Sequence, residues 1–446
     1  MKTLLRGGTI VNEGEIFRGD VLVDGELIES VTRGEIDAIP RGTRVIDATG
    51  KRVIPGIIDD QVHFREPGLT RKGDIGEGSR AAAAGGITSF MDMPNVLPPT
   101  TTRALLREKH EIASRVSVAN YSFYLGASAG NIEEIRQLDP RHACGVKIFM
   151  GSSTGDLLVE REEEIDAILD ASPVLIAVHC EDNAIIRQNL ARYRQIHGEN
   201  IPPACHPLIR DRAACIASST LATRLARARP ASRLHLLHLS TREEINLLDD
   251  GPRRDRRVTG EACIHHLWFN DSAYLSLGNR VKWNPAIKDE EDRVALLRAV
   301  NERRVDVIAT DHAPHLLAEK EGTYERAASG GPMVQHALPV MLELAERGEI
   351  TLPAIVDAMS HAPADIFRVD RRGYLRPGYK ADIVILERHP WRVTASNLLY
   401  KCGWSPLEGL TLSHRVATTI INGRVVYRDG QLTGEHPGEP LLFNDR

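Results

Sequence analysis

Reactive side chains stand within, at the ends of, or just after short hydrophobic segments through the middle of this chain. These positions hold three histidines, one aspartate and one lysine: His63, His179, His238, Asp311 and Lys147. Imidazole and carboxylate groups together suit Zn²⁺ or a similar divalent ion. Such an ion lowers the pKa of a bound water towards neutrality and polarises a carbonyl group. We therefore predict a metal-dependent hydrolytic site, with Asp311 accepting the water's proton and returning it to a leaving nitrogen.

Lysine is an unusual member of this set, because a cationic Lys147 would repel a metal. Carboxylation by CO₂ would turn it into an anionic carbamate that can bridge two ions. Taken alone, Lys147 is more simply a solvated or salt-bridged lysine, and Asp311 a helix cap. The joint occurrence at successive segment ends favours a site. His235, His265 and His266 are interpreted as ordinary structural or surface histidines.

The elements that must position these residues alternate between hydrophobic segments and helical patterns. The predicted strands are Ile54–Asp59, Thr88–Met93, Ser122–Leu125, Gly145–Met150, Val174–His179, Leu234–Leu239, Arg256–Glu261 and Val305–Asp311. The predicted helices include Gly76–Ala84, Arg103–Arg115, Ile209–Ala228, Glu290–Val300 and Leu338–Arg347. A strand followed by a helix, repeated about eight times, predicts an α/β fold with a (β/α)8 TIM-type barrel, whose reactive groups lie at the carboxyl ends of the strands.

Both ends of the chain have a different pattern, with short β-rich runs broken by Asp24-Gly25 and Asn422-Gly423. Such dipeptides favour hairpins. We expect one small flanking β-sandwich built from both termini. The predicted divisions are 1–52 for its N-terminal part, 53–368 for the barrel, and 369–446 for its C-terminal part and tail.

Composition narrows the class of protein. Hydrophobic residues make up 42% and charged residues 26% of 446, and the net charge is -5, which gives no basic footprint for nucleic acid. The six cysteines are scattered, without a C-x-x-C pair, which favours reduced thiols and a cytoplasmic protein. No segment is long and apolar enough to cross a membrane. A homodimer is the expectation for a soluble enzyme.

Several motifs occur in an order that resembles the dihydroorotases of the metal-dependent amidohydrolase superfamily, in particular the class I bacterial type. The segment Asp59–Gly68, which reads DDQVHFREPG, is similar to their D-x-H-x-H-x-R motif. The later motifs follow in the expected order: Met93–Asn95, His179–Asp182, His238–Ser240, Glu261–His266, Lys282–Pro285 and Thr310–His315. The resemblance covers nearly the whole chain.

This resemblance implies a fold, a reaction and residue roles. The fold is the metal-dependent hydrolase barrel, and the reaction is the reversible cyclisation of N-carbamoyl-L-aspartate to L-dihydroorotate and water in pyrimidine biosynthesis. His63, His179, His238 and Asp311 match metal ligands, and Lys147 matches the carboxylated lysine. The residues that match contacts to the substrate and its free carboxylate are Arg65, Asn95, Asn284 and His315. An arginine fork and amide or imidazole donors suit a carboxylate.

The chain departs from the family pattern at position 61, where Gln61 stands in place of the first metal-binding histidine. A carboxamide oxygen is neutral and a weaker zinc ligand than imidazole. We expect one Zn²⁺, or two with one position compromised, and Gln61 as a ligand through its amide oxygen or as the holder of a water.

Other functions remain open from the sequence. A hydantoinase or allantoinase would share the metal ligands without needing Arg65, Asn95 and His315. An inactive scaffold subunit of aspartate transcarbamoylase would explain Gln61 but not the retained ligands, and the same transcarbamoylase is a possible partner of an active enzyme. The segment Ser152–Glu164, Gly/Ser-rich and then acidic, is either a lid or a solvated loop leading into a helix.

Overall fold

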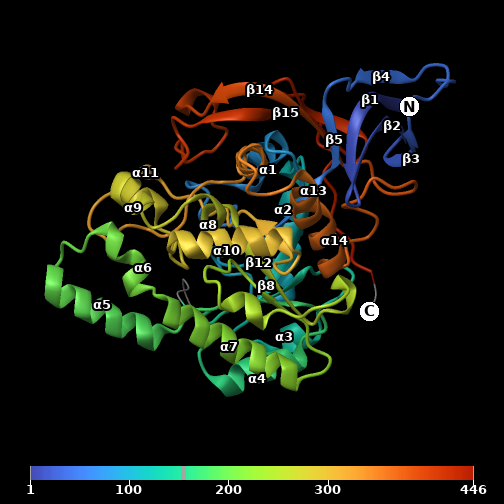
Figure 1. Ribbon diagram of the computed structural model, residues 1–446. Helices are drawn as coiled ribbons and strands as arrows, with labels where there is room; N and C mark the ends of the chain where they lie inside the picture. Colours follow the sequence, from blue (N-terminus) through green and yellow to red (C-terminus); the bar gives the residue numbers. More distant parts are fainter. Residues whose placement is uncertain (1, 152–156, 445–446) are drawn as a thin grey trace.

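The computed structural model describes residues 2–151 and 157–444, and an eight-stranded parallel barrel lies at its centre (Figure 1). Its strands run in chain order around the barrel: β6 (Ile57–Val62), β7 (Ile87–Asp92), β8 (Asn120–Gly126), β9 (Gly145–Phe149), β10 (Ile176–His179), β11 (Leu234–Leu236), β12 (Val258–Cys263) and β13 (Val307–Ala309). Each predicted barrel strand overlaps one of these, and the predicted barrel is confirmed.

The barrel closes where its first strand, β6, meets its last strand, β13. Among the described residues, the contacts there are side-chain hydrogen bonds and isolated β-bridges. Asp59 Oδ2 accepts a hydrogen bond from Thr310 Oγ1 at 2.6 Å, and Val62 forms an isolated bridge with His312. The buried Asp59 carboxyl has its pKa raised to about 7 by burial. This seam brings the end of β6 beside the residues that follow β13, so His63 and Asp311 become neighbours.

Helices surround the barrel, and the longer ones mostly begin at a capping Asp or Thr side chain. They are α1 (Ile75–Ala84), α2 (Arg103–Val116), α3 (Ile132–Arg136), α4 (Glu162–Ala171), α5 (Asn183–His197), α6 (His206–Ile209), α7 (Arg212–Ala228), α8 (Ile264–Trp268), α9 (Ala273–Leu277), α10 (Glu290–Asn301), α11 (Leu317–Lys320), α12 (Ala337–Glu346), α13 (Leu352–Val356) and α14 (Ala362–Phe367). The single helix expected over Ile209–Ala228 is wrong at its start. Asp211 caps α7 by accepting from the backbone of Ala214, so the helix begins at Arg212.

Strands from both ends of the chain form one further sheet of nine strands, at the top and upper right of Figure 1. The N-terminal strands are β1 (Lys2–Asn12), β2 (Glu15–Asp24), β3 (Leu27–Arg33), β4 (Arg44–Asp47) and β5 (Arg52–Pro55), and the C-terminal ones are β14 (Ile383–Arg392), β15 (Thr411–Ile421), β16 (Arg424–Arg428) and β17 (Gln431–Leu432). The two groups join where β5 pairs with β14. Side chains of both groups share one hydrophobic cluster, so the flanking β unit needs both termini.

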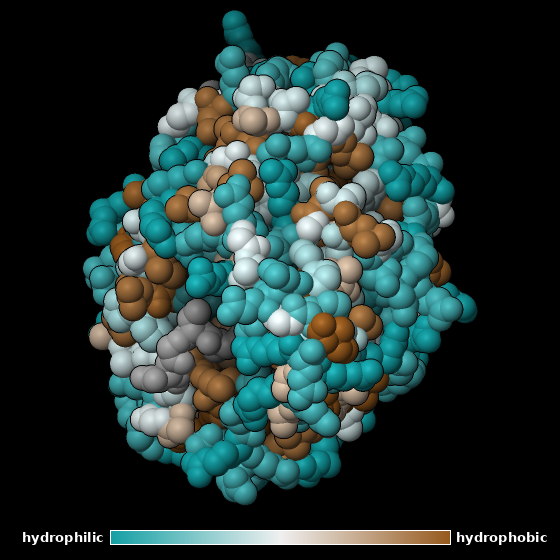
Figure 2. All heavy atoms as spheres, turned by 90° about the vertical axis from the view of Figure 1, so that its left-hand side faces the viewer, coloured by the Kyte–Doolittle hydropathy of each residue, from teal (hydrophilic) through white to brown (hydrophobic). Residues whose placement is uncertain are grey.

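Three helices that follow barrel strands, α5, α9 and α11, lie on the left of Figure 1, and Figure 2 shows that face. Hydrophilic residues cover most of it, and hydrophobic ones are scattered rather than gathered in one patch. None of the described helices is long and apolar enough to cross a membrane. The possible lid at Ser152–Glu164 lies partly outside the described residues, and its end begins α4.

Candidate active site

A cavity of about 330 Å³ opens at the carboxyl ends of the barrel strands. All ten residues that the sequence analysis assigned to a site line it: Gln61, His63, Arg65, Asn95, Lys147, His179, His238, Asn284, Asp311 and His315. They come from seven different strand ends and loops, separated by as many as 254 positions between Gln61 and His315. The structure therefore brings the whole predicted set together, while the role of each residue stays a prediction.

His63 and Asp311 form one half of the reactive group. His63 Nε2 lies 3.2 Å from Asp311 Oδ1, and His63 Nδ1 donates to Asn95 Oδ1 at 2.7 Å. Because the amide oxygen only accepts, the proton of a neutral His63 sits on Nδ1 and the lone pair of Nε2 faces Asp311. Gln61 Nε2 donates to the same Asp311 oxygen at 3.3 Å. Asn95 therefore orients His63, a contact that the sequence analysis did not foresee.

His179 and His238 form the other half. His179 Nε2 donates to Glu181 Oε2 at 2.9 Å, which leaves the lone pair of Nδ1 facing His238 Nε2 at 3.0 Å. Arg210 pairs with the same Glu181 carboxylate. Burial alone would raise the pKa of Glu181, but Arg210 and His179 lower it to about 2. This carboxylate therefore stays ionised and holds the imidazole. Burial in turn lowers the pKa of both His179 and His238, which keeps both rings neutral.

These two pairs fit a divalent metal ion. Two ligands that share a tetrahedral zinc at about 2.0–2.1 Å lie about 3.3 Å apart, close to the separations of His179 from His238 and of His63 from Asp311. His238 Nδ1 is also buried and has no hydrogen-bond partner within residues 2–151 and 157–444. A neutral imidazole held by a second group through its other nitrogen is the arrangement that metal ligands adopt.

Lys147 lies in the same cavity with 1% of its surface exposed, and its Nζ stands 4.7 Å from the centre of the Phe149 ring. Burial lowers the pKa of Lys147 to about 8, although Glu261 and Asp311 oppose the shift. The amine is thus unusually easy to deprotonate. A neutral amine is the form that can add CO₂, so the environment of Lys147 is compatible with carboxylation.

Positive charge gathers at another part of the cavity wall. Arg65, of which 6% is exposed, donates from Nε to Pro314 O at 3.1 Å and from Nη2 to His315 Nε2 at 3.1 Å. Lys72 Nζ lies 3.1 Å from His315 Nδ1 and 3.2 Å from Glu319. Burial lowers the pKa of Arg65 to about 10, which leaves it cationic at neutral pH. This wall can bind an anionic group of a ligand.

Three of the site residues have left-handed backbone, a conformation that costs energy for residues other than glycine. The φ angles are 69° at Arg65, 39° at His238 and 44° at Asp311. Such strain of order 1–3 kcal/mol is tolerated where the surrounding structure fixes the residue, and it concentrates at functional sites. The turns after β6, β11 and β13 therefore point these side chains into the cavity rather than along the strands.

Sequence reasoning missed several residues of this region. Phe149, Trp283, Ser329 and Gly330 also line the cavity, and Lys72 contacts its wall. The Gly330-Gly331 pair was the available signal for a loop that approaches closely, because Gly330 has a φ of 116°. No pattern in the sequence distinguished Lys72 from the adjacent Arg71.

The three histidines interpreted as structural or surface residues are all buried. His265 stacks on Trp283 with ring centres 4.5 Å apart, and His266 Nε2 lies 3.1 Å from Pro285 O. Both therefore support the loop that carries Asn284. The third, His235, lies inside the barrel beside two carboxylates.

Comparisons with known proteins agree with this geometry. A family model described as the amidohydrolase family matches residues 52–426, which include every predicted site residue. A dihydroorotase from Methanothermobacter thermautotrophicus is 32% identical over 418 residues, which cover 92% of this chain and 90% of that protein. A dihydroorotase from Bacillus pumilus is 33% identical over 446 residues, which cover 97% of this chain and 100% of that protein.

Solved structures show the same architecture. An L-hydantoinase (dihydropyrimidinase) from Arthrobacter aurescens superposes with a TM-score of 0.93 at 25% identity and covers 99% of each chain. A dihydropyrimidinase from Brevibacillus agri has a TM-score of 0.87 at 22% identity over 100% of both chains. The second of these likenesses concerns the fold alone.

Proposed function

The chain belongs to the amidohydrolase family, and we propose that it is a dihydroorotase, which interconverts N-carbamoyl-L-aspartate and L-dihydroorotate. The observation that carries this proposal is the presence of Arg65 and His315 in the same cavity as the histidines, Lys147 and Asp311. A substrate with a ring amide and a separate carboxylate needs a hydrolytic group and an anion-binding group at once.

His63, His179, His238 and Asp311 would hold Zn²⁺, with Lys147 in its carboxylated form as a further ligand. When bound, the metal supplies a polarised carbonyl and an acidified water. Glu181 and Asn95 keep the imidazoles of His179 and His63 in fixed tautomers. Gln61 donates to Asp311, so its amide nitrogen rather than its oxygen faces that carboxylate. This supports a single ion, or two ions of which one is weakly held.

Asp311 is the group that moves the proton. Its carboxylate lies at the cavity surface, where it can accept a proton from the attacking water and deliver it to the ring nitrogen as the amide bond breaks. In the direction of ring closure the same oxygen takes the proton from the carbamoyl nitrogen. Arg65 binds the substrate carboxylate through its guanidinium and so fixes the ring over Asp311.

A hydantoinase is the second candidate, and the TM-score of 0.93 with an L-hydantoinase favours it. Its cyclic substrates lack the carboxylate of dihydroorotate, so the cationic wall of Arg65 and Lys72, with His315 between them, would have no ligand. An inert scaffold would need neither this wall nor the oriented histidines. Both observations support the dihydroorotase.

We propose a homodimer in the cytoplasm, with aspartate transcarbamoylase as a possible partner. The six cysteines are all free and buried, which suits a reducing compartment.

The test is an assay of purified protein with L-dihydroorotate, N-carbamoyl-L-aspartate, hydantoin and dihydrouracil, before and after chelation and after return of Zn²⁺. Turnover of the two carboxylate-bearing substrates alone, lost on chelation and restored by zinc, is the expected result. Faster turnover of hydantoin would assign a hydantoinase instead. Inactivity of zinc-loaded protein towards all four compounds would refute hydrolysis of these cyclic amides.

A further inference from the structure

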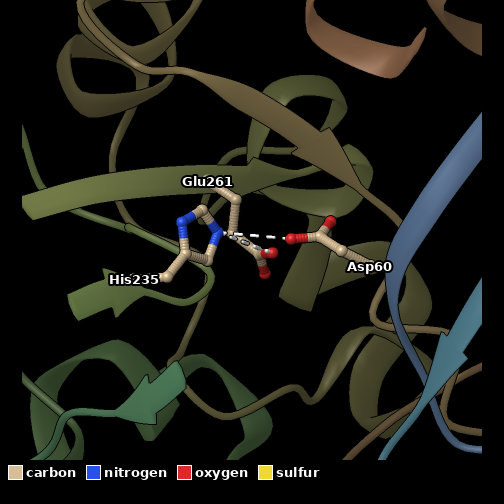
Figure 3. Close-up of side chains that lie close together, drawn as sticks. All are labelled: Asp60, His235 and Glu261. Carbon is tan, nitrogen blue, oxygen red and sulfur yellow. Dashed lines mark ion pairs between the residues drawn. The ribbon is translucent and has the colours of Figure 1, made fainter. Parts of the chain in front are cut away.

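A second group of potential metal ligands lies inside the barrel, apart from the cavity. Asp60 on β6, His235 on β11 and Glu261 on β12 are each completely buried, and none of them lines the cavity (Figure 3). His235 Nε2 lies 3.3 Å from Asp60 Oδ2 and 3.4 Å from Glu261 Oε2. Across residues 2–151 and 157–444, this is the one group of three His, Cys, Asp or Glu residues whose ligand atoms all lie within 4.8 Å of one another.

The facing atoms of this triad lack hydrogen bonds. Both Asp60 carboxylate oxygens, His235 Nε2 and Glu261 Oε2 are buried without a hydrogen-bond partner in the described structure. Buried polar atoms are costly to leave unsatisfied, and groups of them mark a missing ligand or ion. Figure 3 shows that the ring nitrogen of His235 points towards both carboxylates.

The opposite edge of the His235 ring fixes its tautomer. His235 Nδ1 lies 2.8 Å from Thr259 Oγ1, and that hydroxyl itself donates to Leu234 O at 3.4 Å. The hydroxyl must then accept from Nδ1–H, which leaves the lone pair of a neutral ring on Nε2. A lone pair that faces two carboxylates is repulsive unless a positive charge lies between them. Metal-binding histidines are held through their other nitrogen in this way.

The charge balance favours a divalent ion. When both carboxyl groups are ionised, they and a neutral imidazole carry a net charge of about -2, which a divalent cation neutralises. Without a cation this charge is unfavourable, since burial and Asp60 raise the pKa of the Glu261 carboxyl to about 8. Burial alone would lower the pKa of His235, but Asp60 and Glu261 raise this pKa to about 9. The position between the carboxylates therefore stabilises positive charge, whether a proton or a metal supplies it.

We propose that Asp60, His235 and Glu261 form a structural binding site for a divalent transition-metal ion such as Zn²⁺ inside the barrel, beneath the catalytic cavity. One nitrogen and two oxygens with separations of 3.3 and 3.4 Å match the ligand spacing of about 3.3 Å in a tetrahedral zinc site. This site is additional to the metal of the proposed hydrolysis and does not depend on that activity.

The site has a link to the cavity and a route to the opposite end of the barrel. Glu261 Oε1 accepts from the backbone N–H of His238 at 3.0 Å, so an ion that fixes Glu261 also fixes a residue of the cavity. At the amino-terminal ends of the strands, Phe367 packs its ring 5.6 Å from that of His235. Phe367 also lines a second cavity of about 300 Å³, from which an ion could enter when this ring moves.

Anomalous diffraction at the zinc edge tests the proposal on the whole wild-type protein loaded with Zn²⁺ alone. A peak between Asp60 Oδ2, His235 Nε2 and Glu261 Oε2 is the expected result, whatever the cavity contains. Peaks in the cavity with none in the triad would overturn the proposal and assign a proton to His235. Since enzyme activity is not the readout, failure of the proposed function leaves this result interpretable.

Metal analysis of variants adds a second measurement. Asp60→Asn should contain one fewer equivalent of Zn²⁺ per chain than wild type after loading and desalting. Glu244→Gln is the matched control, because Glu244 is also a buried carboxylate but bonds to Thr241 instead of the triad, and it should keep the wild-type content. Equal zinc in wild type and Asp60→Asn would count against the site, and the wild-type crystal decides if the variant does not fold.

Discussion

The cavity and the interior triad contain similar side chains in different surroundings. In the cavity, His63 and His179 are each held by a neighbour, and together with His238 they face open space of about 330 Å³. In the triad, His235 faces two carboxylates out of reach of solvent, since all three side chains are fully buried. The same ligand types can thus serve chemistry where a substrate can approach, and structure where it cannot.

The cavity and the triad also differ in the charge of the groups that surround them. The cavity places Arg65 and Lys72 on one wall and Asp311 among the histidines, so it offers both a cationic and an anionic surface to a ligand. In the triad, the charged groups that face the imidazole of His235 are the carboxylates of Asp60 and Glu261. Selection of an organic substrate needs the first arrangement, whereas the second selects for a small cation. Four substitutions test this contrast.

The largest effect is expected from Asp311→Asn. It removes the group that moves the proton, so kcat should fall about 10³-fold, within the range for loss of a general acid–base. Steady-state rates in both reaction directions measure this. Asp170→Asn, on the outside of α4 with 62% of its side chain exposed, should retain wild-type activity. A loss of less than tenfold in Asp311→Asn would remove Asp311 from the proton transfer.

Asp60→Asn should mainly reduce stability. Loss of one partner of a buried ionic group costs about 3–5 kcal/mol, so the thermal midpoint should fall by several degrees. Scanning calorimetry with and without chelator separates the contributions. Chelator should lower the midpoint of wild type more than that of Asp60→Asn, and equal shifts would mean that the triad binds no metal.

Arg65→Gln should weaken substrate binding rather than chemistry. A hydrogen bond to a charged group contributes about 1.5–3 kcal/mol, so kcat/KM for dihydroorotate should fall about 10- to 100-fold, mostly through KM. Arg71→Gln is the control, since the side chain of Arg71 is 68% exposed and pairs with Glu319 instead. An unchanged KM in Arg65→Gln would contradict the assignment of the cationic wall to the carboxylate.

Gln61→His should have the smallest effect, and it restores the D-x-H-x-H-x-R motif that the segment Asp59–Gly68 resembles. An imidazole is a better zinc ligand than a carboxamide, so the cavity should bind its metal about tenfold more tightly, equivalent to about 1.4 kcal/mol. Competition with a chromogenic chelator measures this affinity. Identical affinities would show that position 61 does not face the metal.

Much of the fold could be predicted because its signals are local. Alternating hydrophobic segments and helical patterns predicted eight strands that the barrel contains, and the reactive residues in or just after five of these segments predicted which side chains meet. Barrel topology forces the carboxyl ends of parallel strands together, so chain order was enough. The break before Arg212 was missed because a single capping carboxylate, Asp211, decided it.

The sequence by itself determined the barrel and the flanking β unit, because both depend on residue type and periodicity along the chain. It also predicted ten of the residues that line the cavity: His63, Lys147, His179, His238 and Asp311 from their places along the strand pattern, and the others from the motifs that the chain shares with dihydroorotases. Only the tertiary structure decided which partner holds each imidazole. Asn95 and Glu181 orient His63 and His179, and Lys72 reaches His315. It also placed His235 between Asp60 and Glu261. Such contacts join strands far apart in sequence, and the distances between side chains inside a closed barrel are set by its packing rather than by any local pattern.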